Sequence, residues 1–211
     1  METEVRFYYS NNSKDKIIDY LKKIKELEYI GRVYEKTEQY NHPMKEYDFY
    51  SKEIDGRFRI RKTENSSKSK CMITWKKRIN SSEEKIHQEE EVELSIKPEE
   101  YPNLIFLLEK VLKLVLVESY ERYRSVIHNE DVEIAVDRYP FGTAIEIENK
   151  SRIKNPKEVV TSWANNIGLN INDAYTLSWD DKYAELCKEQ NKKIESIVTF
   201  GKDMPVVKKD F

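Results

Sequence analysis

The chain has 211 residues, of which 38% are apolar and 36% are charged, and its formal net charge at pH 7 is only −2. This length fits a single domain, residues 1–211, with a hydrophobic core of its own. The balance of basic and acidic residues argues against nonspecific binding to nucleic acids or membranes, because both need an excess of one sign.

Cysteine and histidine residues are few and scattered. Cys71 and Cys187 lie far apart, and neither they nor the three histidines have the spacing of a zinc site or a disulfide framework. The acidic N-terminus is unlike a signal sequence, and the most apolar run, residues 104–117, is too short and too charged to cross a bilayer. We therefore expect a cytoplasmic protein with reduced cysteines and no membrane contact.

Four segments carry the apolar spacing of helices. They cover residues 13–27, 99–117 and 155–167, and a last helix is expected to begin at Ser178. The third has the most complete signals: Asn155 can cap it, Pro156 suits its first position, and Gly168 can end it.

Runs with period two lie between these helices and predict strands. They cover residues 2–9, 32–40, 47–52, 57–63, 70–79, 86–96, 119–128, 132–138 and 143–149, with polar loops near 65–69 and 80–85. Short turns join several of them, which favours antiparallel pairing. The predicted fold class is α+β, with a closed or nearly closed antiparallel barrel of about eight strands and flanking helices.

Charged residues collect on one face of each predicted strand, because successive side chains point to opposite faces. These faces hold Glu2, Glu4 and Arg6; Arg57, Arg59 and Arg61; Lys76 and Arg78; Glu89, Glu91 and Glu93; Arg122 and Arg124; Glu133 and Asp137; and Glu146 and Glu148. Such alternation also fits the solvated face of an ordinary two-layer protein. Like charges two residues apart repel, however, so strands that are all arginine or all glutamate on one face point to a site that needs both signs.

A barrel closed around these faces would have a water-filled bore with cross-paired charges, because burying them unpaired is too costly. Arginine binds phosphate oxygens through its planar fork, and carboxylates suit Mg²⁺ or Mn²⁺. A small molecule that carries a triphosphate, bound with one or two metal ions, would satisfy both sets. No specific nucleic-acid partner is expected, although a 5′-triphosphorylated RNA end has the same chemistry.

Several of these segments resemble motifs of the CYTH, or triphosphate tunnel metalloenzyme, superfamily. Residues 2–6 resemble its Glu-x-Glu-x-Lys signature, residues 58–61 its Leu-Arg-Ile-Arg strand, and residues 73–76 its Leu-Thr-Tyr-Lys strand. Residues 87–91, 122–124, Asp137 and 142–148 resemble its Arg-x-Glu-x-Glu, Lys-x-Arg, aspartate and Gly-x-x-x-Glu-x-Glu motifs in the same order. The order and spacing over residues 1–148 are more specific than any single motif.

The resemblance implies an eight-stranded tunnel, metal dependence and roles for particular residues. It implies that Glu2, Glu4, Glu146 and Glu148 bind metal with Asp137 assisting, that Arg6, Arg59, Arg61, Lys76, Arg122 and Arg124 hold phosphates with Arg57 and Arg78 as further candidates, and that Glu4, Glu148 and Lys76 are catalytic. Two positions depart from the family pattern. Arg6 replaces a lysine and cannot readily give up a proton, and His87 replaces an arginine, so a phosphate contact there is absent or pH-dependent.

Three functions use this set of residues. The first is a metal-dependent triphosphatase that hydrolyses inorganic triphosphate or an organic or nucleoside triphosphate. The second is a class IV adenylate cyclase that converts ATP to cyclic AMP and pyrophosphate, and the motifs do not choose between the two. The third, a noncatalytic polyphosphate-binding module, has no need for the Glu-x-Glu pairs at Glu2, Glu4, Glu146 and Glu148.

Overall fold

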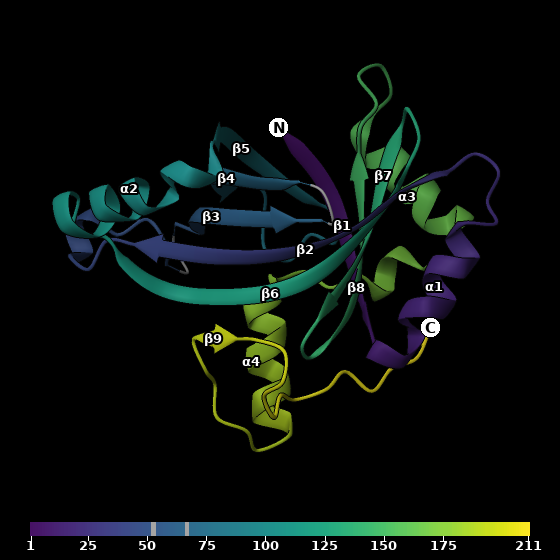
Figure 1. Ribbon diagram of the computed structural model, residues 1–211. Helices are drawn as coiled ribbons and strands as arrows, with labels where there is room; N and C mark the ends of the chain where they lie inside the picture. The colour runs from purple at the N-terminus through teal and green to yellow at the C-terminus, as the bar shows by residue number, and fades with distance from the viewer. Residues whose placement is uncertain (52–53, 66–67) are drawn as a thin grey trace.

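The computed structural model describes residues 1–51, 54–65 and 68–211. Within these residues, eight antiparallel strands close into a barrel in the order β2-β3-β4-β5-β1-β8-β7-β6, and β6 pairs back with β2 (Figure 1). The strands are β1 (Glu2–Tyr9), β2 (Glu28–Asn41), β3 (Gly56–Glu64), β4 (Ser69–Arg78), β5 (His87–Ile96), β6 (Val115–His128), β7 (Val132–Tyr139) and β8 (Gly142–Asn149). A short strand, β9 (Ile197–Val198), adds to β6 in parallel. The predicted α+β barrel is confirmed.

Helices cover three parts of the barrel (Figure 1). Their bounds are α1 (Lys14–Leu21), α2 (Tyr101–Phe106), α3 (Pro156–Asn166) and α4 (Trp179–Glu189), with a π-helical turn η4 (Leu107–Val111) and 3₁₀ turns η1 (Asn11–Ser13), η2 (Lys45–Tyr47), η3 (Pro98–Glu100) and η5 (Ile171–Asp173). Helices α1 and α3 bury their apolar faces against β1, β7 and β8 in one core, and α4 packs in a second core with the other end of those strands. None of the helices in the described part of the chain is long and apolar enough to span a membrane.

The end signals of α3 and α4 act as the sequence predicts. The Asn155 side chain accepts hydrogen bonds from the backbone N–H groups of Lys157 and Glu158, and Gly168 beyond the helix has a φ of +78°. Ser178 and Asp181 form a reciprocal capping box at the start of α4. These contacts fix where α4 begins, which matters because its first residues line the cavity described below.

Two predicted elements differ from the structure. Residues 47–52 are not a strand: Tyr47 ends the 3₁₀ turn η2, residues 48–51 run irregularly, and Lys52 lies outside the described residues. The Asn41 side chain bonds the Phe49 N–H and the Tyr50 carbonyl, at 3.2 Å each. Side-chain amides can take over backbone groups in this way, so the segment gains no strand partner.

The predicted helix over 99–117 is wrong at its C-terminal end. It closes through the π-helical turn, Lys113 adopts a φ of +60°, and β6 begins at Val115. The first helix likewise ends at Leu21, before residue 27, although Ile24 and Leu27 still pack against the core. The predicted loop over 80–85 is confirmed, whereas residues 66–67 of the loop over 65–69 lie outside the described part.

The junctions between barrel strands differ greatly in length. The β2–β6 junction runs from Glu28 opposite His128 to Asn41 opposite Val115. The β1–β5 junction has only the pairs Glu2–Glu89, Thr3–Gln88 and Glu4–His87. The barrel is therefore closed by a short seam at the N-terminal half of β1.

Candidate functional site

The barrel encloses a cavity of about 970 Å³, lined by side chains from all eight barrel strands and from the start of α4. The predicted site residues that line it are Glu2, Glu4, Arg6, Arg57, Arg59, Arg61, Lys76, Arg78, Arg122, Arg124, Glu146 and Glu148. The structure therefore brings together every predicted phosphate-binding residue and four of the five predicted metal ligands, and it places Asp137 elsewhere.

Asp137 lies behind the cavity wall and is fully buried, with 0% of its surface exposed. Its carboxylate accepts hydrogen bonds from Arg124 Nε (2.7 Å) and from Arg124 Nη2 (2.5 Å). It also accepts one from Arg122 Nη1 at 2.8 Å. In this geometry the carboxylate is occupied by two guanidinium groups and orients both of them.

Arg122 is the centre of a second buried network. Its Nε donates to Glu35 Oε2 at 2.6 Å, and its Nη1 donates to the Tyr139 hydroxyl at 3.1 Å. Burial alone would raise the pKa of Glu35, but the positive charges of Arg122 and Arg61 outweigh it and hold that pKa well below its usual range. Glu35 is therefore ionised and acts as a fixed counter-charge.

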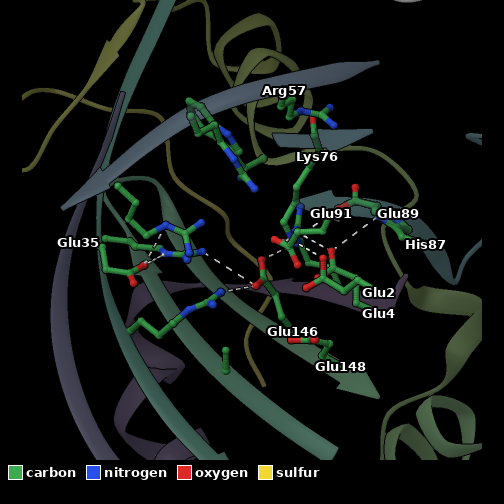
Figure 2. A pocket seen from close by; sticks show the side chains of 18 of the residues that line it. Glu2, Glu4, Glu35, Arg57, Lys76, His87, Glu89, Glu91, Glu146 and Glu148 are labelled. Atoms are coloured by element: carbon green, nitrogen blue, oxygen red, sulfur yellow. Dashed lines mark hydrogen bonds and ion pairs between the residues drawn. The ribbon is translucent and has the colours of Figure 1, made fainter. Parts of the chain in front are cut away.

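Glu146 connects the arginines to the carboxylates of β1. It forms an ion pair with Arg6 at 2.8 Å and also accepts a hydrogen bond from Arg124. Arg6 donates to Glu4 Oε1 at 3.0 Å. Burial opposes ionisation of Glu146, yet these arginines keep its pKa well below the usual range. Figure 2 shows Glu146 between the arginine side of the pocket and the Glu2–Glu4 side.

Lys76 reaches across the cavity from β4 to the acidic side (Figure 2). It donates a hydrogen bond to Glu2 and lies 3.0 Å from Glu91 and 3.7 Å from Glu89. Burial would lower the pKa of this ammonium group, but the carboxylates raise it above its usual value. Lys76 therefore stays charged among these glutamates.

The carboxylates at this end face one another across neighbouring strands. Glu4 and Glu148 are direct cross-strand partners, and so are Glu133 and Glu148. Burial, with added repulsion from nearby carboxylates, raises the pKa of Glu4 to about 8 and that of Glu148 to about 7, although Arg6 opposes the shift at Glu4. Like charges directly opposite on a sheet are destabilising, so a cation here would relieve the repulsion.

A hard divalent metal fits this donor set, because the carboxylates are gathered inside a cavity and Mg²⁺ and Mn²⁺ prefer oxygen ligands. Glu4 forms an ion pair with Arg6, and Glu148 forms one with Lys150. No group of three acidic, histidine or cysteine side chains in the described ranges is close enough to form a ready-made site. Metal binding would therefore exchange these ion pairs for coordination bonds.

The arginines of β3 have donors with no acceptor. Buried nitrogen atoms without a hydrogen-bond partner include the Nε atoms of Arg57, Arg59 and Arg61 and the Nη2 atom of Arg122. Arg59 forms no ion pair with any residue of the described ranges. Unsatisfied buried donors are costly, so this wall has the chemistry to accept anionic oxygens from a ligand.

Arg78 and His87 serve the loops as well as the cavity. Arg78 donates to the Thr176 carbonyl at 2.5 Å and to two carbonyls of the β4–β5 loop. His87 is buried with its Nε2 atom 3.3 Å from the Tyr175 carbonyl, and burial with nearby arginine charges lowers its pKa to about 3. The imidazole is therefore neutral at pH 7, and both side chains hold the segment before α4 against the barrel.

Several lining residues were missed by the sequence argument. They are Glu35, Tyr50, Asp55, Lys150, Asp180 and Asp181. Glu35 lies in the predicted strand over 32–40, which carries both acidic and basic residues. Alternation along that strand could have placed Glu35 on the cavity face. Asp180 looked like an ordinary first-turn residue of α4, and nothing in the sequence placed that turn at the cavity.

No family model and no curated protein matches this chain. Among solved structures, it is similar to PH1819 protein from Pyrococcus horikoshii OT3 at 21% identity and a TM-score of 0.66, covering 90% of this chain and 99% of that chain. It is also similar to a candidate adenylate cyclase from Vibrio parahaemolyticus (14% identity, TM-score 0.60, 84% and 95% covered). A candidate adenylate cyclase from Bacillus halodurans gives 13% identity and a TM-score of 0.52, covering 79% and 89%.

At these low identities, the structural similarity establishes the fold alone. The chain is a closed eight-stranded barrel, and it shares its fold with those candidate adenylate cyclases. It has the tunnel fold that its resemblance to the CYTH superfamily predicts.

Proposed function

We propose that this protein is a divalent-metal-dependent triphosphatase that holds its substrate inside the barrel. The observation that carries the proposal is the set of unpartnered guanidinium donors in a cavity that also gathers carboxylates. A triphosphate bound with Mg²⁺ or Mn²⁺ is the ligand that satisfies both. The oxygens of the chain fit the arginines, and the metal fits the acidic end.

The phosphate-binding role belongs to Arg59, Arg61, Arg122 and Arg124, with Arg6 and Lys76 at the border with the carboxylates. Arg57 already pairs with Asp55 at 2.8 Å and is a further candidate. The donors of Arg78 are mostly used by backbone carbonyls, so its contact with phosphate would be electrostatic.

Glu2, Glu4 and Glu148 would hold the metal, which supplies charge neutralisation and polarises the phosphoryl group. Metal binding by Glu146 and Asp137 stays a prediction, because each would first have to leave its arginines. Glu148 would accept the proton of the attacking water through a carboxylate oxygen that does not bind the metal. Water would then attack the terminal phosphorus, the bridging P–O bond would break, and orthophosphate and diphosphate would leave.

Product analysis tests this proposal. The protein is incubated with inorganic triphosphate, thiamine triphosphate, ATP and a 5′-triphosphorylated RNA, each with Mg²⁺ or Mn²⁺. Release of orthophosphate supports hydrolysis. Tight binding of triphosphate without turnover would instead favour a noncatalytic module.

Two variants test the carboxylates. We expect Glu4→Ala and Glu148→Ala to lower metal-dependent turnover about 100-fold or more while circular dichroism and the melting temperature stay close to wild type. Glu130→Ala, in the exposed β6–β7 turn, is the matched control. Near-normal turnover in either cavity variant would refute its assigned role.

Adenylate cyclase is the second candidate, because the chain shares its fold with two candidate adenylate cyclases. In that reaction the ribose hydroxyl attacks the α-phosphorus and pyrophosphate leaves. Cyclic AMP and pyrophosphate as the products of ATP would replace the triphosphatase proposal with this one.

A further inference from the structure

Arg57, Arg59 and Arg61 of β3 form one wall of the cavity, the arginine wall. The end of the cavity next to α4 has a different chemistry. Five residues define this α4 subsite: Gln39 on β2, Glu118 on β6, Tyr50 from the segment before β3, and Trp179 and Asp180 from the first turn of α4. Tyr50, Trp179 and Asp180 line the cavity directly.

Gln39 is placed on the cavity face by its strand partners. It is the cross-strand partner of Arg59 on one side and of Glu118 on the other. Cross-strand partners share a face of the sheet, and Arg59 lines the cavity. The Gln39 amide therefore lies where the arginine wall ends and the α4 subsite begins.

Polar atoms in this subsite have no partner. Gln39 is 1% exposed, and neither its Oε1 nor its Nε2 atom makes a hydrogen bond within the described ranges. Trp179 is 4% exposed, and its indole N–H has no acceptor within the described ranges. Oε2 of Glu118 likewise has no hydrogen-bond partner there. Buried polar groups are costly when unpaired, so the subsite suits a ligand with both donors and acceptors.

The charges at this end disfavour a phosphate. Asp180 accepts a hydrogen bond from the Tyr50 hydroxyl at 2.5 Å. Burial and the negative charge of Asp180 raise the pKa of Glu118 to about 8, so Glu118 carries a proton at neutral pH. Arg57 is the cation next to these groups, 5.8 Å from the centre of the Tyr50 ring. The subsite itself is made of carboxyl, amide, hydroxyl and indole groups, which suit an uncharged polar group better than phosphate oxygens.

Two aromatic rings of the core lie beside these polar groups. Trp179 packs against Tyr120 with ring centroids 4.3 Å apart, and both residues line the cavity. Both rings are nearly buried, and the atoms that reach the cavity offer apolar contact to a planar ligand. The cavity volume of about 970 Å³ is at the upper end of the range of pockets that hold whole organic ligands, and so leaves space beside a triphosphate.

We propose that the α4 subsite binds a planar organic group that both donates and accepts hydrogen bonds, with a nucleobase as the best match, while its triphosphate extends into the arginine wall. An amide side chain is a known bidentate partner for the edge of a base. The proposal deepens the proposed function and rests on it, because the same cavity has to hold the phosphates. It makes a nucleoside triphosphate, rather than inorganic triphosphate, the preferred ligand.

A comparison of the affinities for several triphosphates tests the proposal. Dissociation constants of the full chain for inorganic triphosphate, ATP, GTP, CTP and UTP are measured by calorimetry in EDTA, so that no turnover occurs. We expect at least one nucleotide to bind about tenfold more tightly than inorganic triphosphate. We expect Gln39→Met, which removes the amide, and Trp179→Phe, which removes the N–H, each to reduce that ratio about tenfold.

Gln88→Met on β5 and Trp163→Phe on α3 are matched controls outside the cavity lining, and should keep the wild-type ratio. The proposal is overturned if no nucleotide binds more tightly than inorganic triphosphate, or if both subsite variants leave the ratio within twofold of wild type. Should one variant fail to fold, the other decides. Failure of inorganic triphosphate to bind both in EDTA and in the presence of Mg²⁺ would instead overturn the proposed function.

Discussion

Arginines of β6 and of β3 face the same cavity, but they differ in how many carboxylates of the protein they bind. On β6, Arg122 and Arg124 are held by Asp137, and Arg122 also by Glu35. On β3, Arg59 has no ion-pair partner within the described residues, and Arg61 lies 3.8 Å from Glu35. We call these the β6 wall and the β3 wall. In the β6 wall most guanidinium donors already bind carboxylates of the protein, although Arg122 Nη2 has no partner in the described residues, whereas the β3 wall leaves more of its hydrogen-bonding capacity to a ligand.

The largest expected effect comes from breaking the β6 wall. Asp137→Asn leaves two buried guanidinium groups short of a counter-charge, so we expect a loss of roughly 3–5 kcal/mol in the free energy of unfolding. Urea denaturation measures it. Asp203→Asn, at an exposed pair with Lys192, is the control and should cost less than about 1 kcal/mol. Equal losses in the two variants would contradict the assigned role of Asp137.

A substitution in the β3 wall should reduce ligand affinity more than stability. Arg59→Ala removes a buried cation that has no ion-pair partner among the described residues, so we expect little loss of stability. We expect a tenfold to hundredfold weaker binding of inorganic triphosphate, as about 1.5–3 kcal/mol per charged hydrogen bond implies. Arg59→Lys should recover part of the affinity. Calorimetry and urea denaturation on the same samples separate the two effects, and a variant that lost stability but kept affinity would make Arg59 structural.

A smaller effect concerns the pH dependence of stability at Glu118, where the β3 wall meets the α4 subsite. Glu118 has a pKa of about 8 in the folded protein against an ordinary value of 4.5, so the folded state holds its proton over this window. Its contribution to stability is therefore present below about pH 4.5 and is lost as the pH rises to about 8.

Glu118→Gln removes this titration. Relative to wild type, the variant should become progressively more stable between about pH 5 and pH 8.5, as measured by urea denaturation at several pH values. Glu90→Gln, on the exposed face of β5, is the control. Parallel stability curves for wild type and Glu118→Gln would contradict the raised pKa.

The contrast between the walls also shows how far the sequence could lead. Strand parity placed the predicted arginines and glutamates in one cavity, because alternation is a local property of strands. It could not show that Asp137, on the cavity-facing parity of β7, would be covered by the two arginines it holds. Which ionic groups pair with each other depends on the order of the strands in the barrel and on the rotamers of the side chains. Alternation gives the face of each strand but neither of these.

The α4 subsite was beyond the sequence argument for a related reason. Tyr50 and Asp180 are separated by 130 positions and meet through a hydrogen bond between their side chains. Residues 47–52 were predicted to be a strand, and the irregular path that brings Tyr50 to the cavity depends on the Asn41 side chain. Contacts of this kind come from the folded topology, which motif spacing does not contain.

The short β1–β5 seam has a consequence for the motions of the barrel. A junction of three residue pairs, one of them Glu2 opposite Glu89, should be the first to separate when the native protein fluctuates, and its amide protons should exchange with solvent faster than those of the β2–β6 junction. A cation shared by Glu2 and its neighbours would clamp that opening. Deuterium uptake along β1 would then report occupancy of the acidic end without any chemistry taking place.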